Sequence, residues 1–156
     1  MTEERSKSAS KMSSAVAGML DLQGFLPFRI HRIATMIANS GSHLAMKRAK
    51  LGLREWRVLA VVGSAGECQQ RSVTSFSAMD PATVTRAVRN LLDRGLIGQK
   101  VSSEDGRSNV LRLTAEGVAL YSELARERLE FQEQLQQSMT DLEWLTLMMM
   151  LDKLDE

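Results

Sequence analysis

The sequence has little of what secreted proteins and membrane proteins require. It holds one cysteine among 156 residues, and only 4% of its residues are aromatic. A single cysteine excludes an internal disulfide and is typical of a reducing compartment, so we expect a cytoplasmic protein. No apolar run approaches the ~18 residues of a membrane span, and no signal peptide stands at the N-terminus. We therefore expect no membrane partner.

Groupings of residues that carry catalysis or bind metals are also missing. The sequence shows no pattern that brings a nucleophile next to a general base, and no pair of carboxylates within an apolar segment. Gly63-Ser64-Ala65-Gly66 lacks the lysine that follows in a phosphate-binding loop. His31 and His43 have no acidic or cysteine companions. The sequence therefore predicts no enzyme, no metal site and no cofactor.

What is present is the composition of one ordinary globular domain, with 44% apolar and 25% charged residues. The net charge of +1 conceals an asymmetry between the middle and the end of the chain. Residues 29–112 carry 14 Lys and Arg against 6 Asp and Glu, whereas residues 113–156 carry 3 against 10. This distribution indicates an anionic partner for the middle only, although chance clustering of solvated side chains is the alternative.

Residues 80–95 have the pattern of a helix with defined ends. Asp80 can accept a hydrogen bond from an unpaired backbone N–H, and Pro81 suits the first helical position. Gly95 supplies the left-handed residue that ends a helix. One face is an apolar stripe, and the opposite face carries small, hydroxyl, amide and guanidinium side chains. The stripe consists of Val84, Val88, Leu91 and Leu92, and the opposite face of Ala82, Thr83, Thr85, Arg86, Arg89 and Asn90.

Two short extended runs follow this helix. Residues 97–101 and 110–114 alternate as strands do, and residues 102–108 (SSEDGRS) are too polar and turn-rich to be anything but a loop. We interpret the whole as a DNA-reading helix followed by a β-wing, which together make a winged helix. Residues 69–77 are predicted to form the first helix of the helix-turn-helix.

Four segments of this region match one known family in order and spacing. They are residues 80–86 (DPATVTR), 91–97 (LLDRGLI), 105–107 (DGR) and 111–117 (LRLTAEG). The region resembles the multiple-antibiotic-resistance regulator (MarR) family, and the likeness extends more loosely over roughly residues 25–154. The family usually has Leu-Ala where Val73-Thr74 stand, which leaves helix boundaries there less well defined.

The fold that we expect is mainly α with a small two-stranded β-wing. A winged helix-turn-helix lobe at residues 53–114 is joined to a helical dimerisation region from both termini. Residues 1–18 form a disordered arm, residues 19–52 an N-terminal dimerisation helix with one helix from Pro27 to about Lys50, and residues 115–156 the C-terminal dimerisation helices. The last of these begins at a capping box, Thr140 to Glu143. It is apolar nearly all round and needs a second burying surface, for which we name Leu145, Met148, Met149 and Leu151.

The resemblance implies a homodimer that binds double-stranded DNA at a pseudo-palindrome and represses transcription. Thr85, Arg86 and Arg89 are expected in the major groove, with Thr83 supporting them near the helix N-terminus. Arg107 is expected in the minor groove. Asp105 is expected to orient an arginine. The complete set of expected DNA-binding residues is Thr83, Thr85, Arg86, Arg89, Asn90, Asp105, Arg107 and Ser108.

The resemblance also implies a small effector, aromatic or anionic, that binds between the dimer region and the DNA lobe. Arg29, His31 and Trp56 are the candidates for lining its site, although each of them also suits a structural role. Three other functions stay open: a thiol-responsive regulator acting through Cys68, a ligand-independent or architectural DNA-binding protein, and a protein-interaction module built on a winged helix. Little near Cys68 lowers the pKa of its thiol, which favours an inert cysteine.

Overall fold

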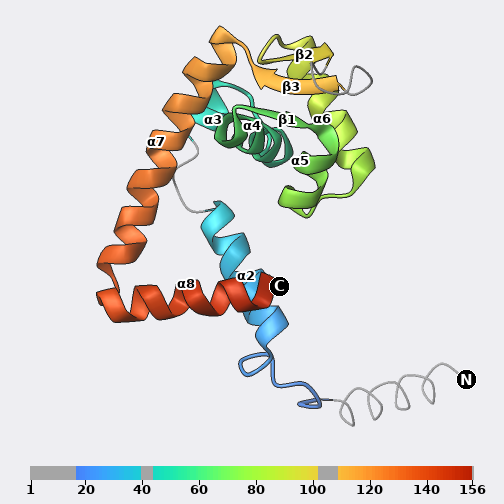
Figure 1. Ribbon diagram of the computed structural model, residues 1–156. Helices are drawn as coiled ribbons and strands as arrows, with labels where there is room; N and C mark the ends of the chain where they lie inside the picture. The colour runs from blue at the N-terminus through green and yellow to red at the C-terminus, as the bar shows by residue number, and fades with distance from the viewer. Residues whose placement is uncertain (1–16, 40–43, 102–108, 156) are drawn as a thin grey trace, which may run out of the picture. The chain divides into compact units, whose positions relative to one another are not determined.

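The computed structural model describes residues 17–39, 44–101 and 109–155 (Figure 1). The chain divides into two compact units, residues 1–41 and 42–156. Within the described ranges, none of the helices combines the length and apolar character that crossing a membrane requires.

The first unit is built around one helix, α2 (Leu26–Asn39). Before it, the Asp21 carboxylate accepts hydrogen bonds from the backbone N–H groups of Gln23 (3.0 Å) and Gly24 (3.1 Å), which fixes the approach to the helix. The large apolar side chains of α2 are exposed on the chain; they are Leu26, Phe28, Ile30, Ile33, Met36 and Ile37. This helix therefore has far more apolar surface than its own unit covers.

One helix from Pro27 to about Lys50 was expected, and the structure has two instead. The first is α2, and the second is α3 (Leu44–Arg48) in the other unit, with residues 40–43 outside the described residues. The sequence across this gap, residues 39–42 (NSGS), consists of poor helix formers. Lys50 then takes a left-handed conformation with φ of 48°, and the N–H of Leu51 bonds back to the Met46 carbonyl (2.8 Å).

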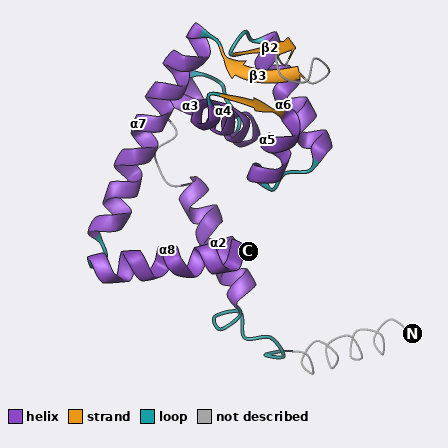
Figure 2. Cartoon of the chain, viewed as in Figure 1, coloured by secondary structure: helices purple, strands orange, loops and turns teal. Residues whose placement is uncertain are grey.

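The second unit holds the helix-turn-helix and the sheet (Figure 2). Besides α3, its described helices are α4 (Leu53–Ala65), α5 (Gln70–Ser77), α6 (Pro81–Asp93), α7 (Ala115–Gln137) and α8 (Asp141–Asp155). α5 ends at Ala78, which is left-handed with φ of 50°, and a short turn leads to α6. The Asp80 carboxylate accepts from the Thr83 N–H (2.9 Å) with Pro81 in the first turn, so the predicted start of α6 is confirmed. The predicted stop is confirmed by Gly95, which has φ of 66°.

The sheet has three strands, not the two that were predicted. β1 (Glu67–Gln69), β2 (Ile97–Val101) and β3 (Asn109–Leu113) are antiparallel in the order β1-β3-β2. Cys68 of β1 pairs with Leu111 of β3, and Ile97 of β2 pairs with Leu113. β1 is a three-residue run without alternation, and it is a strand only because β3 supplies its hydrogen-bond partners.

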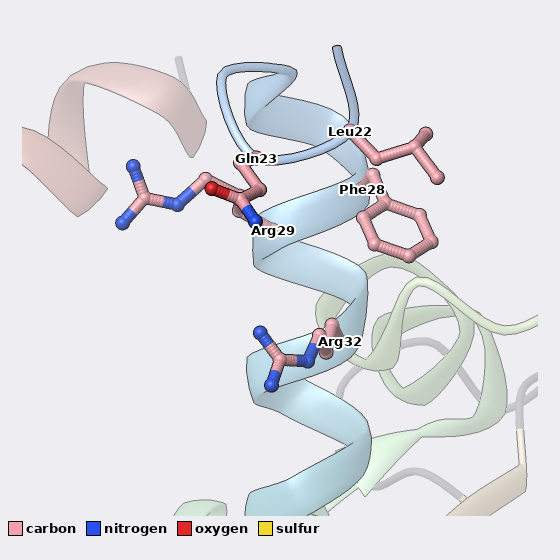
Figure 3. A pocket seen from close by; sticks show the side chains of 5 residues that line it. All are labelled: Leu22, Gln23, Phe28, Arg29 and Arg32. Atoms are coloured by element: carbon pink, nitrogen blue, oxygen red, sulfur yellow. The ribbon is translucent and has the colours of Figure 1, made fainter. Parts of the chain in front are cut away.

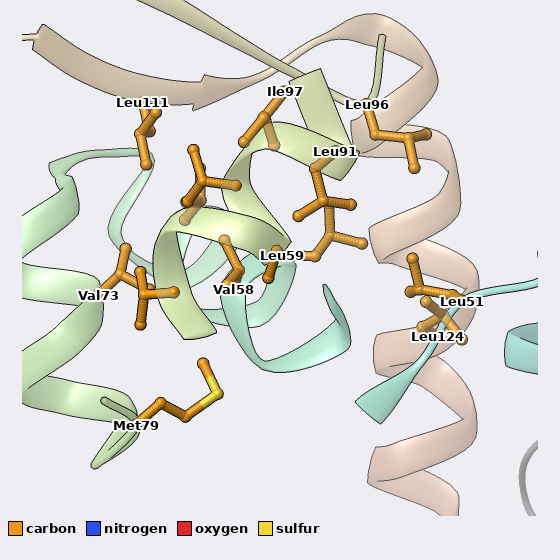
Figure 4. Close-up of a cluster of buried hydrophobic side chains, with 14 of the residues drawn as sticks. Leu51, Val58, Leu59, Val73, Met79, Leu91, Leu96, Ile97, Leu111 and Leu124 are labelled. Carbon is orange, nitrogen blue, oxygen red and sulfur yellow. The ribbon is translucent and has the colours of Figure 1, made fainter. Parts of the chain in front are cut away.

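A single hydrophobic core joins α4, α5, α6 and α7 to the sheet (Figure 4). Its fully buried side chains include Val58 and Leu59 of α4, Leu91 of α6, Leu111 of β3 and Leu124 of α7. Burying each such side chain is worth about 1.5–3 kcal/mol, so this core fixes how α6 is presented.

Two glycines allow α7 to approach its neighbours closely. A Cβ on Gly117 would lie 1.8 Å from the Leu96 carbonyl oxygen, and a Cβ on Gly63 would lie 2.8 Å from the Tyr121 ring. Thr114 caps α7 by accepting from the Gly117 N–H (3.0 Å). Larger residues at either glycine would push α7 away from the lobe.

α8 begins at the predicted capping box, which is confirmed. The Thr140 N–H donates to the Glu143 carboxylate (2.8 Å), and the Glu143 N–H donates to the Thr140 hydroxyl (3.3 Å). The Glu143 carboxylate also accepts from the Thr140 hydroxyl (2.8 Å), and the two bonds that it accepts from the Thr140 N–H and hydroxyl lower the pKa of Glu143. No residue of α8 is buried.

Candidate nucleic-acid interface

α6 divides cleanly into a buried face and an exposed face. Val84, Ala87, Val88 and Leu91 are buried in the core. The exposed face carries Ala82, Thr85, Arg86, Arg89 and Asn90. Four of the predicted contact residues, Thr85, Arg86, Arg89 and Asn90, therefore lie together on the surface of α6. The opposite face anchors them to the lobe.

Thr83 was predicted on the exposed face and is instead buried, with 8% of its surface accessible. Its hydroxyl accepts a hydrogen bond from Arg86 Nη2 (3.0 Å). Hydrogen bonds from the Thr83 side chain and backbone lower the pKa of Asp80, and the Arg86 charge contributes less. Thr83 is placed to orient Arg86 and the helix start; it does not reach outwards. The prediction that Thr83 lies on the exposed face was wrong because Thr83 lies at the edge of the apolar stripe, next to Val84.

Thr85 is held by a residue that sequence reasoning missed. Gln70, the first residue of α5, donates from Nε2 to the Thr85 hydroxyl (2.9 Å), and that hydroxyl donates to the Pro81 carbonyl (2.8 Å). The signal that was available is the position of Gln70 at the start of the first helix of the helix-turn-helix. Which residue of α6 the Gln70 side chain reaches depends on how α5 and α6 pack, and this packing cannot be predicted from the sequence pattern.

The other end of α6 is tied to α3. Arg94 donates from Nη2 to the Ala49 carbonyl (2.6 Å) and from Nη1 to the Lys50 carbonyl (3.3 Å). Arg94 also lines a shallow hollow with Arg86, Arg89, Asn90 and Asp93. The Arg94 guanidinium thus binds the two carbonyls of the turn that follows α3, and it contributes positive charge to the same surface as Arg86 and Arg89.

The tip of the wing lies outside the described residues. Asp105, Arg107 and Ser108, which were predicted to act there, fall within residues 102–108. The base of the wing is described, and Lys100 Nζ of β2 lies 2.7 Å from the Glu67 carboxylate of β1. This ion pair spans the sheet across β3.

The predicted effector residues divide between the two units. Arg29 and His31 lie on α2 in the first unit. Arg29 lines a pocket with Leu22, Gln23, Phe28 and Arg32, and His31 is not among its lining residues. Figure 3 shows the Leu22 and Phe28 side chains together, with Arg29 and Arg32 extending from the other side of α2.

Trp56 lines a different pocket, of about 340 Å³, between α4 and α7 in the second unit. The Trp56 and Tyr121 rings stack with their centroids 6.3 Å apart and their planes at 24°. The Arg128 guanidinium lies 5.8 Å from the centre of the Trp56 ring, and its Nη2 also contacts Met46 Sδ (2.9 Å). Burial lowers the pKa of Arg128, and the neighbouring Glu127 opposes that change. Two aromatic rings beside a partly buried cation suit an aromatic anion.

Cys68 is half-buried in β1. Burial raises the pKa of its thiol. A raised pKa leaves less thiolate at neutral pH, and the thiolate is the reactive form. The surroundings of Cys68 therefore suit a packing role better than oxidation chemistry.

Residues 49–108, which hold α4, the helix-turn-helix and the start of the wing, match the MarR family. A solved MarR/EmrR family transcriptional regulator from Acinetobacter sp. ADP1 is 26% identical, with a TM-score of 0.78 over 86% of this chain and 95% of that one. The DNA-reading lobe of this chain is that of the MarR family.

Two further proteins are similar to this chain. The HTH-type transcriptional regulator YwoH of Bacillus subtilis is 29% identical over 113 residues, which is 68% of this chain and 78% of YwoH. CouR from Rhodococcus jostii RHA1, solved bound to p-coumaroyl-CoA, is 20% identical. Its TM-score is 0.77 over 86% of this chain and 94% of CouR, so it shares the fold.

The family assignment settles the broad class of activity. The protein is a winged helix-turn-helix, DNA-binding transcriptional regulator and not an enzyme, as predicted. The predicted mainly helical fold with a small wing is likewise confirmed, apart from the third strand.

The regulator also carries the four residues predicted for a dimer interface, all exposed on α8. They are Leu145, Met148, Met149 and Leu151, with 41–57% of each accessible. Leu142, Leu147, Met150 and Leu154 of the same helix are exposed as well. Soluble monomers rarely leave so many leucines and methionines of one helix exposed.

Proposed function

We propose that the protein is a ligand-responsive repressor that binds a pseudo-palindromic operator as a homodimer. The observation that supports this most directly is the exposed face of α6. Arg86 donates a hydrogen bond to the Thr83 hydroxyl (3.0 Å), and the Thr85 hydroxyl accepts one from Gln70 (2.9 Å). Side chains ordered before binding lose less conformational entropy when they meet DNA. α6 is the recognition helix of this proposal.

Each part of the interface has a distinct task. Arg86 and Arg89 read base edges in the major groove, where an arginine that contacts guanine bidentately discriminates by about 1–3 kcal/mol. Asn90 lies farther along the same face, and Thr83 acts through Arg86. Arg107 at the wing tip enters the minor groove, and Asp105 orients an arginine, with Ser108 beside them.

The dimer follows from the two apolar surfaces that the units leave exposed. One recognition helix reads few base pairs, so two must be held about one DNA turn apart, ~34–36 Å. α8 and α2 each present apolar side chains that a second copy would bury in an isologous interface. In this proposal residues 19–52 and 115–156 are the dimerisation segments and residues 53–114 the reading lobe. Most of the arm predicted at residues 1–18 lies outside the described residues.

The effector site is the pocket between α4 and α7. Trp56 and Tyr121 supply stacking surfaces, and Arg128 supplies positive charge for an acidic group. The ligand of CouR, an aromatic acyl-CoA, belongs to the chemical class that such a pocket accepts. Arg29 and His31 remain candidates from the first unit. An effector in this pocket would change how α7 packs on the lobe and so the spacing of the two recognition helices.

The experiment that tests the proposal is selection of duplexes from a randomised library with the purified full-length protein, followed by footprinting. We expect one protected pseudo-palindrome, and repression of a promoter that carries it in transcription with purified components. A uniform smear of weak protection contradicts sequence-specific reading and favours a ligand-independent architectural protein. Activation of that promoter contradicts the repressor assignment alone.

The effector is tested by titrating the protein–duplex complex with p-coumarate and with p-coumaroyl-CoA. We expect release of DNA by at least one of these aromatic anions. Arg128→Gln should weaken this release, and Arg126→Gln, which changes an exposed arginine of the same helix, should leave it unaffected. Release that is identical in the two variants contradicts the assigned pocket. Absence of any release by either acid contradicts the class of effector.

A further inference from the structure

Thr85 has a fixed hydrogen-bonding state that limits what it can read. A hydroxyl has one proton to donate and two lone pairs that accept. The Thr85 proton is directed to the Pro81 carbonyl (2.8 Å), and one lone pair accepts from Gln70 Nε2 (2.9 Å). The side chain is exposed, yet it has no proton left to donate to a base.

The orientation of the Gln70 amide follows from the same network. Because the Thr85 proton is engaged with Pro81, only a donor can face the Thr85 oxygen at 2.9 Å. The NH₂ group of Gln70 must therefore point at Thr85, and its carbonyl must point away. Gln70 thus locks the hydroxyl from the adjacent helix.

Locking the hydroxyl also fixes the methyl group. The two are branches of the same Cβ, so holding Oγ1 against Pro81 and Gln70 leaves one rotamer and one direction for Cγ2. Ala82, one turn earlier on the exposed face, adds a second methyl group and no polar atom. This part of α6 presents apolar carbon where a free threonine would offer a donor.

We propose that Gln70 is a positioning residue that makes Thr85 a reader of the thymine methyl group. In the major groove guanine offers only the acceptors N7 and O6, which Thr85 cannot address without a proton. Thymine offers its C5 methyl group, which suits an apolar contact. Each half-site should therefore contain one thymine whose methyl group contributes to binding. The inference rests on the proposed insertion of α6 into the major groove.

The test replaces single thymines by deoxyuridine, which removes only the C5 methyl group, in a duplex selected by the full-length protein. We expect deoxyuridine at one position of each half-site to weaken binding about fourfold, as burial of one carbon group implies. Thr85→Ser keeps both hydrogen bonds and lacks the methyl group, so its affinity should be the same for thymine and deoxyuridine there. Thr85→Val keeps a methyl group and should retain the discrimination. Gln70→Met, similar in size and without a donor, should reduce it by letting the hydroxyl rotate.

Three results would overturn the proposal: selected sites that share no thymine, deoxyuridine that is neutral at every position, or Thr85→Ser that keeps the wild-type sensitivity. The Arg89→Ala variant distinguishes failure of methyl reading by Thr85 from failure of α6 as the recognition helix. If α6 reads the groove but Thr85 does not read a methyl group, Arg89→Ala still changes the selected sequence. If α6 lies outside the groove, neither the Arg89 nor the Thr85 variants change it.

Discussion

α6 and α8 lie in the same unit and have opposite relations to the core. α6 buries one complete face, including Val84, Val88 and Leu91, and leaves polar side chains outside. α8 buries no residue and exposes leucines and methionines around most of its circumference. A helix whose apolar face is buried in the core can present its polar face to a ligand, whereas a helix whose apolar side chains are exposed needs a second protein surface to bury them. α6 thus belongs to the part of the chain proposed to read DNA, and α8 to the part proposed to determine the oligomeric state.

The largest effect should come from placing charge on α8. Leu145→Glu combined with Met149→Glu removes two apolar side chains, each worth about 1.5–3 kcal/mol when buried, and places charges in the proposed interface. We expect the dimer to dissociate or unfold and the affinity for the selected duplex to fall more than for any single base contact. Sedimentation velocity and a DNA titration measure the two effects.

The matched control is Lys153→Glu, which also changes the charge by two on α8 but removes no leucine or methionine. It should leave the dimer intact. A double variant that stays dimeric and binds DNA normally would show that α8 is not the interface.

The next effect concerns the lobe that carries α6. Gly117→Ala places a Cβ where only 1.8 Å separates it from the Leu96 carbonyl, just after α6. Overpacking of this kind costs about 1–3 kcal/mol or more, because backbone must move. The thermal midpoint should fall clearly, while Gly98→Ala, with no atom within 4 Å of its new Cβ, should change it little. Equal midpoints for the two variants would mean that α7 is not packed on the lobe as described.

A smaller and more specific effect is expected from Arg89→Ala. Removing one bidentate base contact should relax preference at one position of each half-site by about 1–3 kcal/mol, with the fold and the dimer unchanged. Repeating the duplex selection with the variant measures this, and Arg57→Ala, an exposed arginine of α4, is the control. If both variants select the wild-type sequence, the reading surface lies elsewhere.

The wing should contribute through charge. Arg107→Ala removes one phosphate-neutralising group, so the slope of log affinity against log salt should decrease by about one on all duplexes. Affinities from 50 to 200 mM salt suffice to measure this slope. An unchanged slope and affinity would remove the wing tip from binding.

The smallest effect is expected at Cys68. Its raised pKa means that the thiolate fraction at neutral pH is lower than for a free cysteine, so alkylation should become fast only at higher pH than for glutathione. Cys68→Ser should bind DNA as the wild type does, with and without peroxide. If peroxide releases DNA from the wild-type protein but not from the Cys68→Ser variant, the thiol-responsive alternative is established.

Local signals explain what the sequence could predict. The start and stop of α6 are encoded within a few residues by Asp80-Pro81 and Gly95, and the capping box of α8 is encoded by Thr140 and Glu143. Each of these depends on one hydrogen bond or one dihedral angle near its own residue. Such features can be read without knowing the fold.

Features that depend on distant partners could not be predicted in this way. β1 exists because β3 pairs with it, and the link from Gln70 to Thr85 exists because α5 and α6 cross at a particular angle. Thr83 was misplaced because burial at the edge of a stripe depends on neighbouring elements. The division of residues 27–50 into two helices was missed because apolar periodicity says nothing about a break within it.

The measurement that tests the whole account most directly is the stoichiometry of the full-length protein on its selected duplex. Sedimentation equilibrium at micromolar concentration gives the mass of the protein alone and of the complex. We expect a dimer in the absence of DNA and two chains on each pseudo-palindromic duplex, with one chain per half-site. A well-folded monomer that occupies the duplex tightly as a single chain would contradict it.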